Sequence, residues 1–311
     1  MRIIFAGSPE YAIPSLEALN SKFGVAAVIT QPDRPVGRKS VLTPTAVKAK
    51  AQELNIPVYD FEKIREHVAD VKALGGDILI TCAYGQMLSQ QILDCFPQGV
   101  WNLHASLLPK FRGASPVQSA ILAGEEYTGV TVMRTELKMD TGDILLVKRY
   151  KIHESDTCGD VQKELSVLSA EAAVEAVELI ASGNVQLLVQ DEAQATYCKK
   201  IQKSDAKIDF TNSSRDICRL INAMNPNPMA FCYHNGNVLN ILRARRAYCT
   251  EGKPGEVVGT SKTGVFVKCG EENDYEGDGV HIIQLQPAGG KKMHAADYAN
   301  GRKIKAGDKL D

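Results

Sequence analysis

The stretch Asp77-Ile78-Leu79-Ile80-Thr81-Cys82-Ala83 is a continuous apolar run that ends at Tyr84-Gly85. A strand with one face in water alternates apolar and polar residues, whereas a strand buried on both faces has no such alternation. Similar runs occupy residues 2–7 and 25–30, and apolar residues at helical spacing follow the first of them. Buried strands separated by helices predict an α/β fold with a mostly parallel, open, Rossmann-like sheet.

The composition is typical of a globular chain and gives no sign of a membrane segment. Of the 311 residues, 44% are hydrophobic and 23% are charged, and the formal net charge is −1. No apolar run reaches the ~18 residues that span a bilayer. The first residues enter a strand-like pattern without a basic leader, so we expect a cytoplasmic protein without a signal peptide. The eight cysteines form no Cys-x-x-Cys pair, so we expect reduced thiols and no metal.

The stretch Trp101-Asn102-Leu103-His104-Ala105-Ser106-Leu107-Leu108-Pro109-Lys110-Phe111-Arg112-Gly113 begins as the end of a buried strand and breaks into a loop. Asn102 and His104 are spaced i and i+2, so their side chains share one face of the strand. Open α/β sheets bind ligands at the carboxyl ends of their strands. We therefore expect the functional site at Asn102 and His104.

A carboxylate is the expected third member of this site, and two aspartates compete for the place. Asp140 and Asp143 lie in a Gly-containing loop between two predicted strands, and their spacing does not separate them. Amide, imidazole and carboxylate fit acyl transfer to an amine, because they supply an oxyanion donor, a proton carrier and its orienting partner. The alternative is a histidine that only binds a backbone carbonyl. Serine-elbow and dinucleotide-binding glycine motifs are absent.

Residues 31–40, Gln-Pro-Asp-Arg-Pro-Val-Gly-Arg-Lys-Ser, form a polar segment rich in Pro, Gly and basic side chains. The composition predicts an exposed loop, and its length exceeds that of an ordinary loop between strand and helix. Arg34, Arg38 and Lys39 could bind a polyanion from it. The alternative is a solvated loop that binds nothing.

The pattern changes after a long predicted helix over residues 159–182. We predict a catalytic domain over residues 1–188, a polar linker over 189–206 and a second domain over 207–311. Short β-like runs separated by Gly predict a small β-barrel in the second domain. Residues 206–311 hold 15 Lys and Arg against 12 Asp and Glu, a net charge of +3, which favours a nucleic-acid role for this domain.

Several motifs together resemble the 10-formyltetrahydrofolate-dependent formyltransferases. The shared motifs are Asn102-Leu103-His104-Ala105-Ser106-Leu107-Leu108-Pro109, Arg112-Gly113 and Met139-Asp140-Thr141-Gly142-Asp143. Four further stretches resemble the members of the family that formylate methionyl initiator tRNA. They are Phe5-Ala6-Gly7-Ser8-Pro9, Gln31 to Arg38, Ala223-Met224-Asn225-Pro226-Asn227-Pro228, and Leu285-Gln286-Pro287-Ala288-Gly289. One departure is Asn227, where the family commonly has an aromatic residue.

The resemblance implies a reaction and assigns its residues. Formyl would pass from 10-formyltetrahydrofolate to the α-amine of methionyl initiator tRNA. Asn102, His104 and Asp140 would form the catalytic set, which chooses Asp140 over Asp143. The remaining implied contacts are Ser106, Leu107, Leu108 and Pro109 at the folate, and Arg34, Arg38, Lys39, Lys199 and Lys200 at the tRNA. The second domain would be an OB-like barrel that helps to hold the tRNA, and we expect a monomer.

Three competing interpretations remain at this level. A formyltransferase acting on a nucleotide sugar can also carry a C-terminal β-domain, but it has little use for a long basic arm. A glycinamide ribonucleotide formyltransferase would leave roughly the last 100 residues unexplained. A tRNA-binding module with an inactive Rossmann-like half would not need the intact Asn102, His104 and Asp140.

Overall fold

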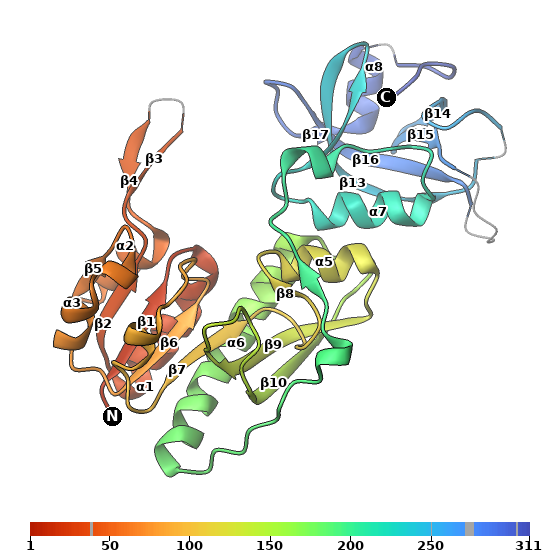
Figure 1. The fold of residues 1–311 in the computed structure, drawn as a ribbon. Coiled ribbons are helices and arrows are strands. Elements are labelled where there is room, and N and C mark those ends of the chain that lie inside the picture. The colour runs from red at the N-terminus through yellow and green to blue at the C-terminus, as the bar shows by residue number, and fades with distance from the viewer. Residues whose placement is uncertain (38–39, 250, 271–276, 303) are drawn as a thin grey trace. The chain divides into compact units, whose positions relative to one another are not determined.

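The computed structural model describes residues 1–37, 40–249, 251–270, 277–302 and 304–311. The chain forms two compact units (Figure 1). The first unit comprises Met1–Pro116, Tyr127–Lys151 and Gln162–Lys199. The second comprises Val117–Glu126, Ile152–Val161 and Lys200–Asp311. No helix among the described residues combines the length and the apolar character needed to cross a membrane.

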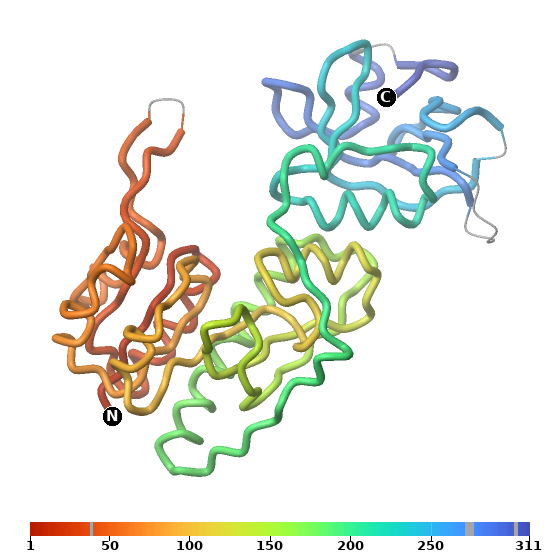
Figure 2. The backbone as a smooth tube through the Cα atoms, in the orientation of Figure 1, coloured from red at the N-terminus to blue at the C-terminus, as the bar shows by residue number. Residues whose placement is uncertain are grey.

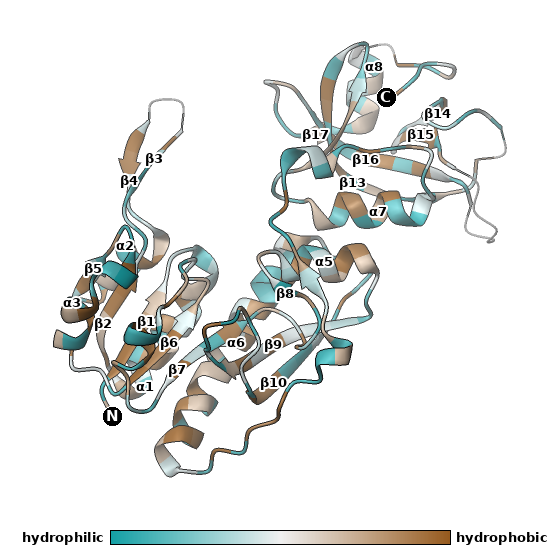
Figure 3. Ribbon diagram, viewed as in Figure 1, coloured by the Kyte–Doolittle hydropathy of each residue, from teal (hydrophilic) through white to brown (hydrophobic). Residues whose placement is uncertain are grey.

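The first unit is built on a seven-stranded sheet in the order β10-β9-β7-β6-β1-β2-β5. Five neighbouring strands, from β7 to β5, are parallel, and β9 and β10 add an antiparallel edge. The strands are β1 (Ile3–Gly7), β2 (Val25–Thr30), β5 (Val58–Asp60), β6 (Ile78–Cys82), β7 (Val100–His104), β9 (Tyr127–Arg134) and β10 (Ile144–Lys151). Every residue of β1 and β6 is buried, and Figure 3 colours the central strands mostly as hydrophobic. The predicted open, mostly parallel sheet is confirmed.

Helices cover this sheet. They are η1 (Glu10–Ala12), α1 (Ile13–Phe23), α2 (Ala46–Glu53), η2 (Ile64–Glu66), α3 (Val68–Ala73), α4 (Gln90–Leu93) and α6 (Cys158–Ser182). The start of α2 is capped by Thr45, whose hydroxyl accepts a hydrogen bond from the Lys48 amide at 3.0 Å. On another side, Tyr11 of η1 and Ser169 of α6 share a hydrogen bond of 2.8 Å.

Residues 61–73 do not form one helix, because η2 and α3 are separated at His67. The side chain of Gln86 binds the backbone where η2 begins. Its amide donates to the carbonyl of Phe61 at 2.7 Å and accepts from the amide of Ile64 at 2.8 Å. These backbone groups are therefore satisfied outside a helix.

The segment expected as an irregular loop is instead a hairpin. Strands β3 (Arg34–Val36) and β4 (Val41–Thr43) pair antiparallel, and all six of their residues are exposed. The hairpin extends from the body of the first unit (Figure 2). Arg38 and Lys39 lie outside the described residues.

The second unit is an antiparallel barrel with flanking helices. Its strand order is β12-β13-β16-β15-β14, with β17 beside β16. The elements are α5 (Pro116–Ala123), whose first residue belongs to the first unit, η4 (Lys203–Ala206), α7 (Ser214–Ala223), β12 (Ala230–His234), β13 (Asn237–Ala247), β14 (Val257–Ser261), β15 (Gly264–Lys268), β16 (Gly279–Pro287), β17 (Met293–His294) and α8 (Ala295–Arg302).

The last residues of the chain close this barrel. Residues 307–311 exchange backbone hydrogen bonds with Tyr233 at β12 and with Gly255 and Val257 at the start of β14. The first and last strands of the sheet are thereby joined through a further extended segment, which removes the open edges. The small β-barrel predicted for the C-terminal part is confirmed.

Candidate active site

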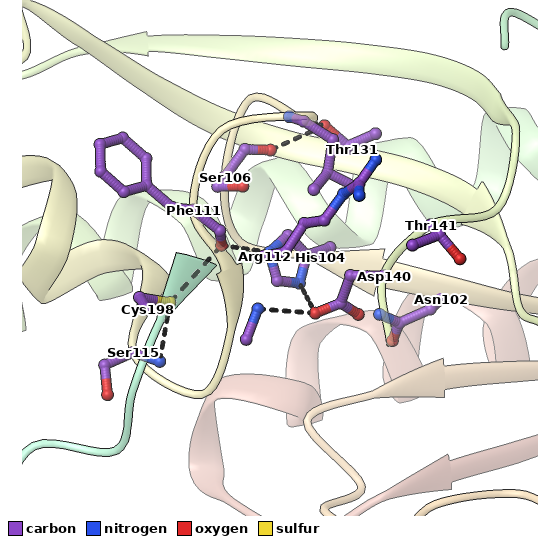
Figure 4. A network of polar contacts seen from close by, with 12 residues as sticks. Asn102, His104, Ser106, Phe111, Arg112, Ser115, Thr131, Asp140, Thr141 and Cys198 are labelled. Atoms are coloured by element: carbon purple, nitrogen blue, oxygen red, sulfur yellow. Dashed lines mark hydrogen bonds and ion pairs between the residues drawn. The ribbon is translucent and has the colours of Figure 1, made fainter. Parts of the chain in front are cut away.

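Asn102 and His104 lie at the carboxyl end of β7, in the middle of the seven-stranded sheet (Figure 4). Their side chains share one face of the strand, as the i, i+2 spacing predicts. Asn102 is half-buried, and only 6% of the surface of His104 is exposed. A polar pair at this depth needs partners, because an unpaired buried polar group is costly.

The amide of Asn102 is oriented by the neighbouring strand β6. The hydroxyl of Thr81 donates to Asn102 Oδ1 at 2.9 Å. With the oxygen engaged, the nitrogen is the free end of the amide, and in Figure 4 it points toward Asp140. Asn102 therefore presents a hydrogen-bond donor at the sheet edge.

The imidazole of His104 is held by a carbonyl and faces a carboxylate. Its Nε2 lies 3.0 Å from the Phe111 carbonyl oxygen. A carbonyl only accepts, so Nε2 carries the hydrogen of this bond. The other nitrogen, Nδ1, lies 3.7 Å from Asp140 Oδ2. The Nδ1 side of the ring is therefore the side that shares the site with Asp140 and Asn102.

Asp140 lies in the loop after β9 and is almost buried, with 13% of its side chain exposed. Its Oδ2 accepts a hydrogen bond from the Gly113 amide at 2.8 Å. Its backbone has a φ of +55°, a left-handed conformation that is uncommon outside glycine. The structure thus places Asp140 beside His104. Asp143 instead accepts a hydrogen bond from the Arg134 amide at its backbone carbonyl.

The loop of Ser106–Pro109 follows His104 and bonds mainly to itself and to β9. The fully buried Ser106 hydroxyl donates to the Lys110 carbonyl at 2.7 Å. The Thr131 hydroxyl donates to the Ser106 carbonyl and accepts from the Leu108 amide, at 2.7 and 3.2 Å. Leu107 and Pro109 are half-buried. The polar groups of Ser106 are therefore used to shape the loop.

A cavity of about 520 Å³ opens beside the same strand. It is lined by Gln90, Leu93, Asp94, Phe96, Gly99, Val100, Arg134, Thr135, Glu136, Leu137 and Lys138. Val100 lies two residues before Asn102, and the Thr135 amide donates to the Val100 carbonyl at 2.7 Å. The volume of the cavity is within the range of small-molecule sites. Ser106–Pro109, all described, are not among its lining residues.

The sequence pattern missed a buried network behind the site. Arg112 is fully buried, and its guanidinium donates to Gln190 Oε1, both Glu192 oxygens and the Tyr197 hydroxyl at 2.8–3.1 Å. The bonds with Glu192 raise the pKa of Arg112, and Arg112 lowers the pKa of the Glu192 carboxyl. The Arg112-Gly113 motif was visible, but Gln190 lies in a polar stretch typical of a linker.

The predicted tRNA contacts that the structure describes are on the surface. Arg34 is exposed and forms an ion pair of 3.2 Å with Glu62, itself exposed. Lys199 and Lys200 are exposed, at the end of the first unit and the start of the second. Lys48, near the hairpin, is bound by Asp33 and Asp60 at 2.7 and 2.6 Å, and the hydrogen bond with Asp33 raises its pKa.

The described residues contain no group of three or more His, Cys, Asp or Glu side chains able to hold a metal ion. The site therefore has an amide donor, an imidazole and a carboxylate at a sheet edge beside a cavity. These groups can polarise a carbonyl, stabilise the oxyanion that forms on attack, and move a proton.

Comparison with known proteins identifies the class. The formyl transferase family model matches residues 1–177, and the model of the formyl transferase C-terminal domain matches residues 200–303. The chain belongs to the formyl transferase family, and it is an enzyme of formyl transfer that uses 10-formyltetrahydrofolate as donor.

Particular relatives cover nearly the whole chain. The methionyl-tRNA formyltransferase of Pseudomonas fluorescens is 42% identical over 98% of this chain and 95% of its own length. That of Bacillus velezensis is 38% identical over 99% and 97%. Among solved structures, the N-formyltransferase from Helicobacter canadensis in complex with folinic acid and dTDP-3-aminofucose has a TM-score of 0.68. It is 19% identical over 91% of this chain and 99% of its own, so it supports the fold alone.

Proposed function

We propose that this chain transfers the formyl group of 10-formyltetrahydrofolate to the α-amine of methionyl initiator tRNA. The observation that carries the proposal is the convergence of Asn102, His104 and Asp140 at one sheet edge. The choice of amine rests on full-length relatives that are named methionyl-tRNA formyltransferase. An α-amino group has an ordinary pKa of about 7.7–8.0, so a neutral, nucleophilic fraction exists at pH 7.

We assign each of the three side chains a role in the transfer. The amine attacks the formyl carbon, and negative charge develops on the formyl oxygen. Asn102 Nδ2 and the protonated Nδ1 of His104 stabilise that oxygen, because both are donors on the same side of β7. Asp140 orients His104 and takes up the proton that the attacking amine releases. The bond from carbon to N10 then breaks, and N10 leaves with the proton that Asp140 took up.

We place the folate ring in the cavity beside β7, with Leu107 and Pro109 of the next loop bordering the transferred group. Apolar walls from Leu93, Phe96 and Val100 suit a flat ring. Leu93→Trp would fill this space, so the KM for 10-formyltetrahydrofolate should rise at least tenfold while the KM for tRNA stays constant. An unchanged folate KM would move the ring elsewhere.

We assign tRNA binding to the exposed hairpin, to Lys199 at the end of the first unit and to basic residues of the second unit. Arg34 of the hairpin, Arg38 and Lys39 shortly after Arg34 in the sequence, and Lys199 and Lys200 supply positive charge for phosphates. Arg38→Ala should raise the KM for tRNA and leave folate binding unchanged. Removing one phosphate contact should also lower the salt dependence of tRNA binding by about one unit of slope. The exposed Arg65 serves as a matched control when replaced by Ala.

One assay separates the acceptor amines. Purified protein and 10-formyltetrahydrofolate are incubated with charged initiator tRNA, with charged elongator tRNA, and with an amino sugar nucleotide. We expect rapid formylation of the initiator tRNA and slow or no formylation of the other two. Formylation of the sugar amine alone would assign the chain to the nucleotide-sugar branch of the family. Binding of tRNA without any formyl transfer would support an inactive binding module.

A further inference from the structure

We propose that Gln190 is a positioning residue for the transfer, because its side chain sets the conformation of the loop that carries Asp140. This inference rests on the proposed role of Asp140. Gln190 follows the isolated β-bridge between Ile144 and Leu188, and only 6% of its surface is exposed. A buried glutamine in a polar connecting segment is unusual, since such side chains are ordinarily solvated.

All the hydrogen-bonding capacity of the Gln190 amide is used. Its Nε2 donates to the carbonyls of Asp140 and Gly142, at 2.9 and 2.7 Å. Its Oε1 accepts from Nε and Nη2 of Arg112, at 3.1 and 2.8 Å. Arginine only donates, so the oxygen must face Arg112 and the nitrogen must face the Asp140 loop. The buried guanidinium thus fixes the direction in which Gln190 donates.

The Asp140 loop has a conformation that requires support. The φ of +55° at Asp140 is in the left-handed region, which is uncommon for a residue other than glycine. A Cβ on Gly142 would lie 1.8 Å from the Arg134 carbonyl oxygen, so the loop passes too close to β9 for a side chain. The bonds from Gln190 act on the carbonyls of these two residues, on either side of Thr141. They therefore hold the turn that directs the Asp140 carboxylate toward His104.

The segment around Gln190 also holds the group that binds the Asp140 carboxylate. Strand β11 (Tyr197–Cys198) pairs in parallel with β8 (Arg112–Gly113). Gly113 supplies the amide that donates to Asp140 Oδ2. The backbone and the carboxylate of Asp140 are thus both fixed by residues 190–198. Loss of either support would displace a carboxylate that lies only 3.7 Å from His104, and an error of 1 Å in such a geometry can cost about 10²-fold in rate.

Two variants of Gln190 test the role. Gln190→Glu keeps an acceptor for Arg112 and removes both donations to the Asp140 loop. Gln190→Leu removes every bond with little change in volume. We expect kcat to fall at least tenfold in both, with the KM for tRNA and for folate within about twofold of wild type. Gln194→Leu is the matched control, because Gln194 is exposed and lies in the same segment, and among the described residues its side chain bonds only Asp191.

A double-mutant cycle with Asp140→Asn distinguishes positioning from general support of the fold. If Gln190 acts through Asp140, Gln190→Glu should change kcat by less than about twofold once Asp140 is Asn. If the losses of kcat in the two single variants multiply in the double variant, the proposal is overturned. An undiminished kcat in Gln190→Glu would overturn it as well. Failure of both variants to fold would assign Gln190 a purely structural role and overturn it as well. A wild-type protein inactive with every amine would instead contradict the proposed function.

Discussion

The two polar residues on β7 illustrate how a strand places donors. Thr81 engages the Asn102 oxygen and the Phe111 carbonyl engages His104 Nε2, so the Asn102 amide nitrogen and His104 Nδ1 are left for the sheet edge. Their shared face follows from the i, i+2 spacing, and could be predicted from sequence. Spacing could not choose between Asp140 and Asp143, and only the family resemblance did, because the choice depends on a left-handed backbone and on Gln190, 50 residues later.

Replacing either donor should slow the chemical step without unfolding the protein. We expect Asn102→Ala and His104→Ala each to reduce single-turnover formylation by ~10²-fold or more, the scale of losing one oxyanion donor. Rapid mixing of enzyme, folate donor and charged initiator tRNA measures this rate directly. Near-normal rates in both variants would remove these residues from the catalytic set.

The support of Asn102 by Thr81 leads to a second prediction at this scale. Thr81→Val removes the hydroxyl that holds Asn102 Oδ1, so the amide can turn its oxygen toward the substrate. We expect kcat to fall by about tenfold, less than for loss of Asn102 itself. Thr128→Val is the control, because Thr128 is buried and its hydroxyl has no partner among the described residues. Equal activity in the two valine variants would show that Thr81 does not orient the amide.

At the scale of the elements, continuous apolar runs identified the buried strands, and the long helix α6 followed from its spacing. Two elements could not be predicted, for different reasons. The start of η2 at Ile64 depends on Gln86, a side chain more than twenty residues away from the backbone groups that it binds. The hairpin of β3 and β4 has the Pro and Gly content that also marks loops, and its six exposed residues carry no burial pattern.

The short sheet of β8 and β11 depends on Arg112, and its loss should weaken the first unit. Arg112→Met would leave Gln190 Oε1 buried without its two donors, at a cost of about 1–3 kcal/mol. The only tryptophan, Trp101, is buried in β7, so its fluorescence during urea unfolding reports on this unit. Arg65→Met is the control, because it replaces an exposed arginine and should leave the midpoint of urea unfolding unchanged. Identical midpoints for the two variants would show that the buried guanidinium contributes no net stability.

At the scale of the whole molecule, each unit has its own core and its own titrating groups. In the barrel, His281 is 1% exposed and stacks on Phe266 with ring centroids 4.4 Å apart. Arg245 Nε donates to its Nδ1 at 3.1 Å, so that nitrogen is unprotonated. Burial and the Arg245 charge lower the pKa of His281 below its ordinary value. The folded barrel therefore resists protonation of this ring.

The sign of the resulting pH dependence follows. Below pH ~6.5 the unfolded chain binds a proton at position 281 before the folded chain does, so the free energy of unfolding falls as pH drops from there. The variant His281→Phe keeps the stacking on Phe266. Its free energy of unfolding should not show this decline between pH 7.5 and 5.5. Urea unfolding followed by circular dichroism measures the free energy of unfolding at each pH. Trp101 fluorescence, recorded in parallel, identifies the unfolding of the first unit. His294→Phe, at an exposed position, should keep the wild-type decline; a pH dependence unaffected by His281→Phe would contradict the argument.

The bonds of Gln190 also bear on the order in which the enzyme is assembled. They link Gln190 to Arg112, which lies 78 positions earlier in the sequence, and to Asp140, which lies 50 positions earlier. A ribosome has added His104 and Asp140 long before it adds Gln190. The nascent chain therefore acquires its sheet before its catalytic geometry, and becomes competent for formyl transfer only after the segment around Gln190 has docked.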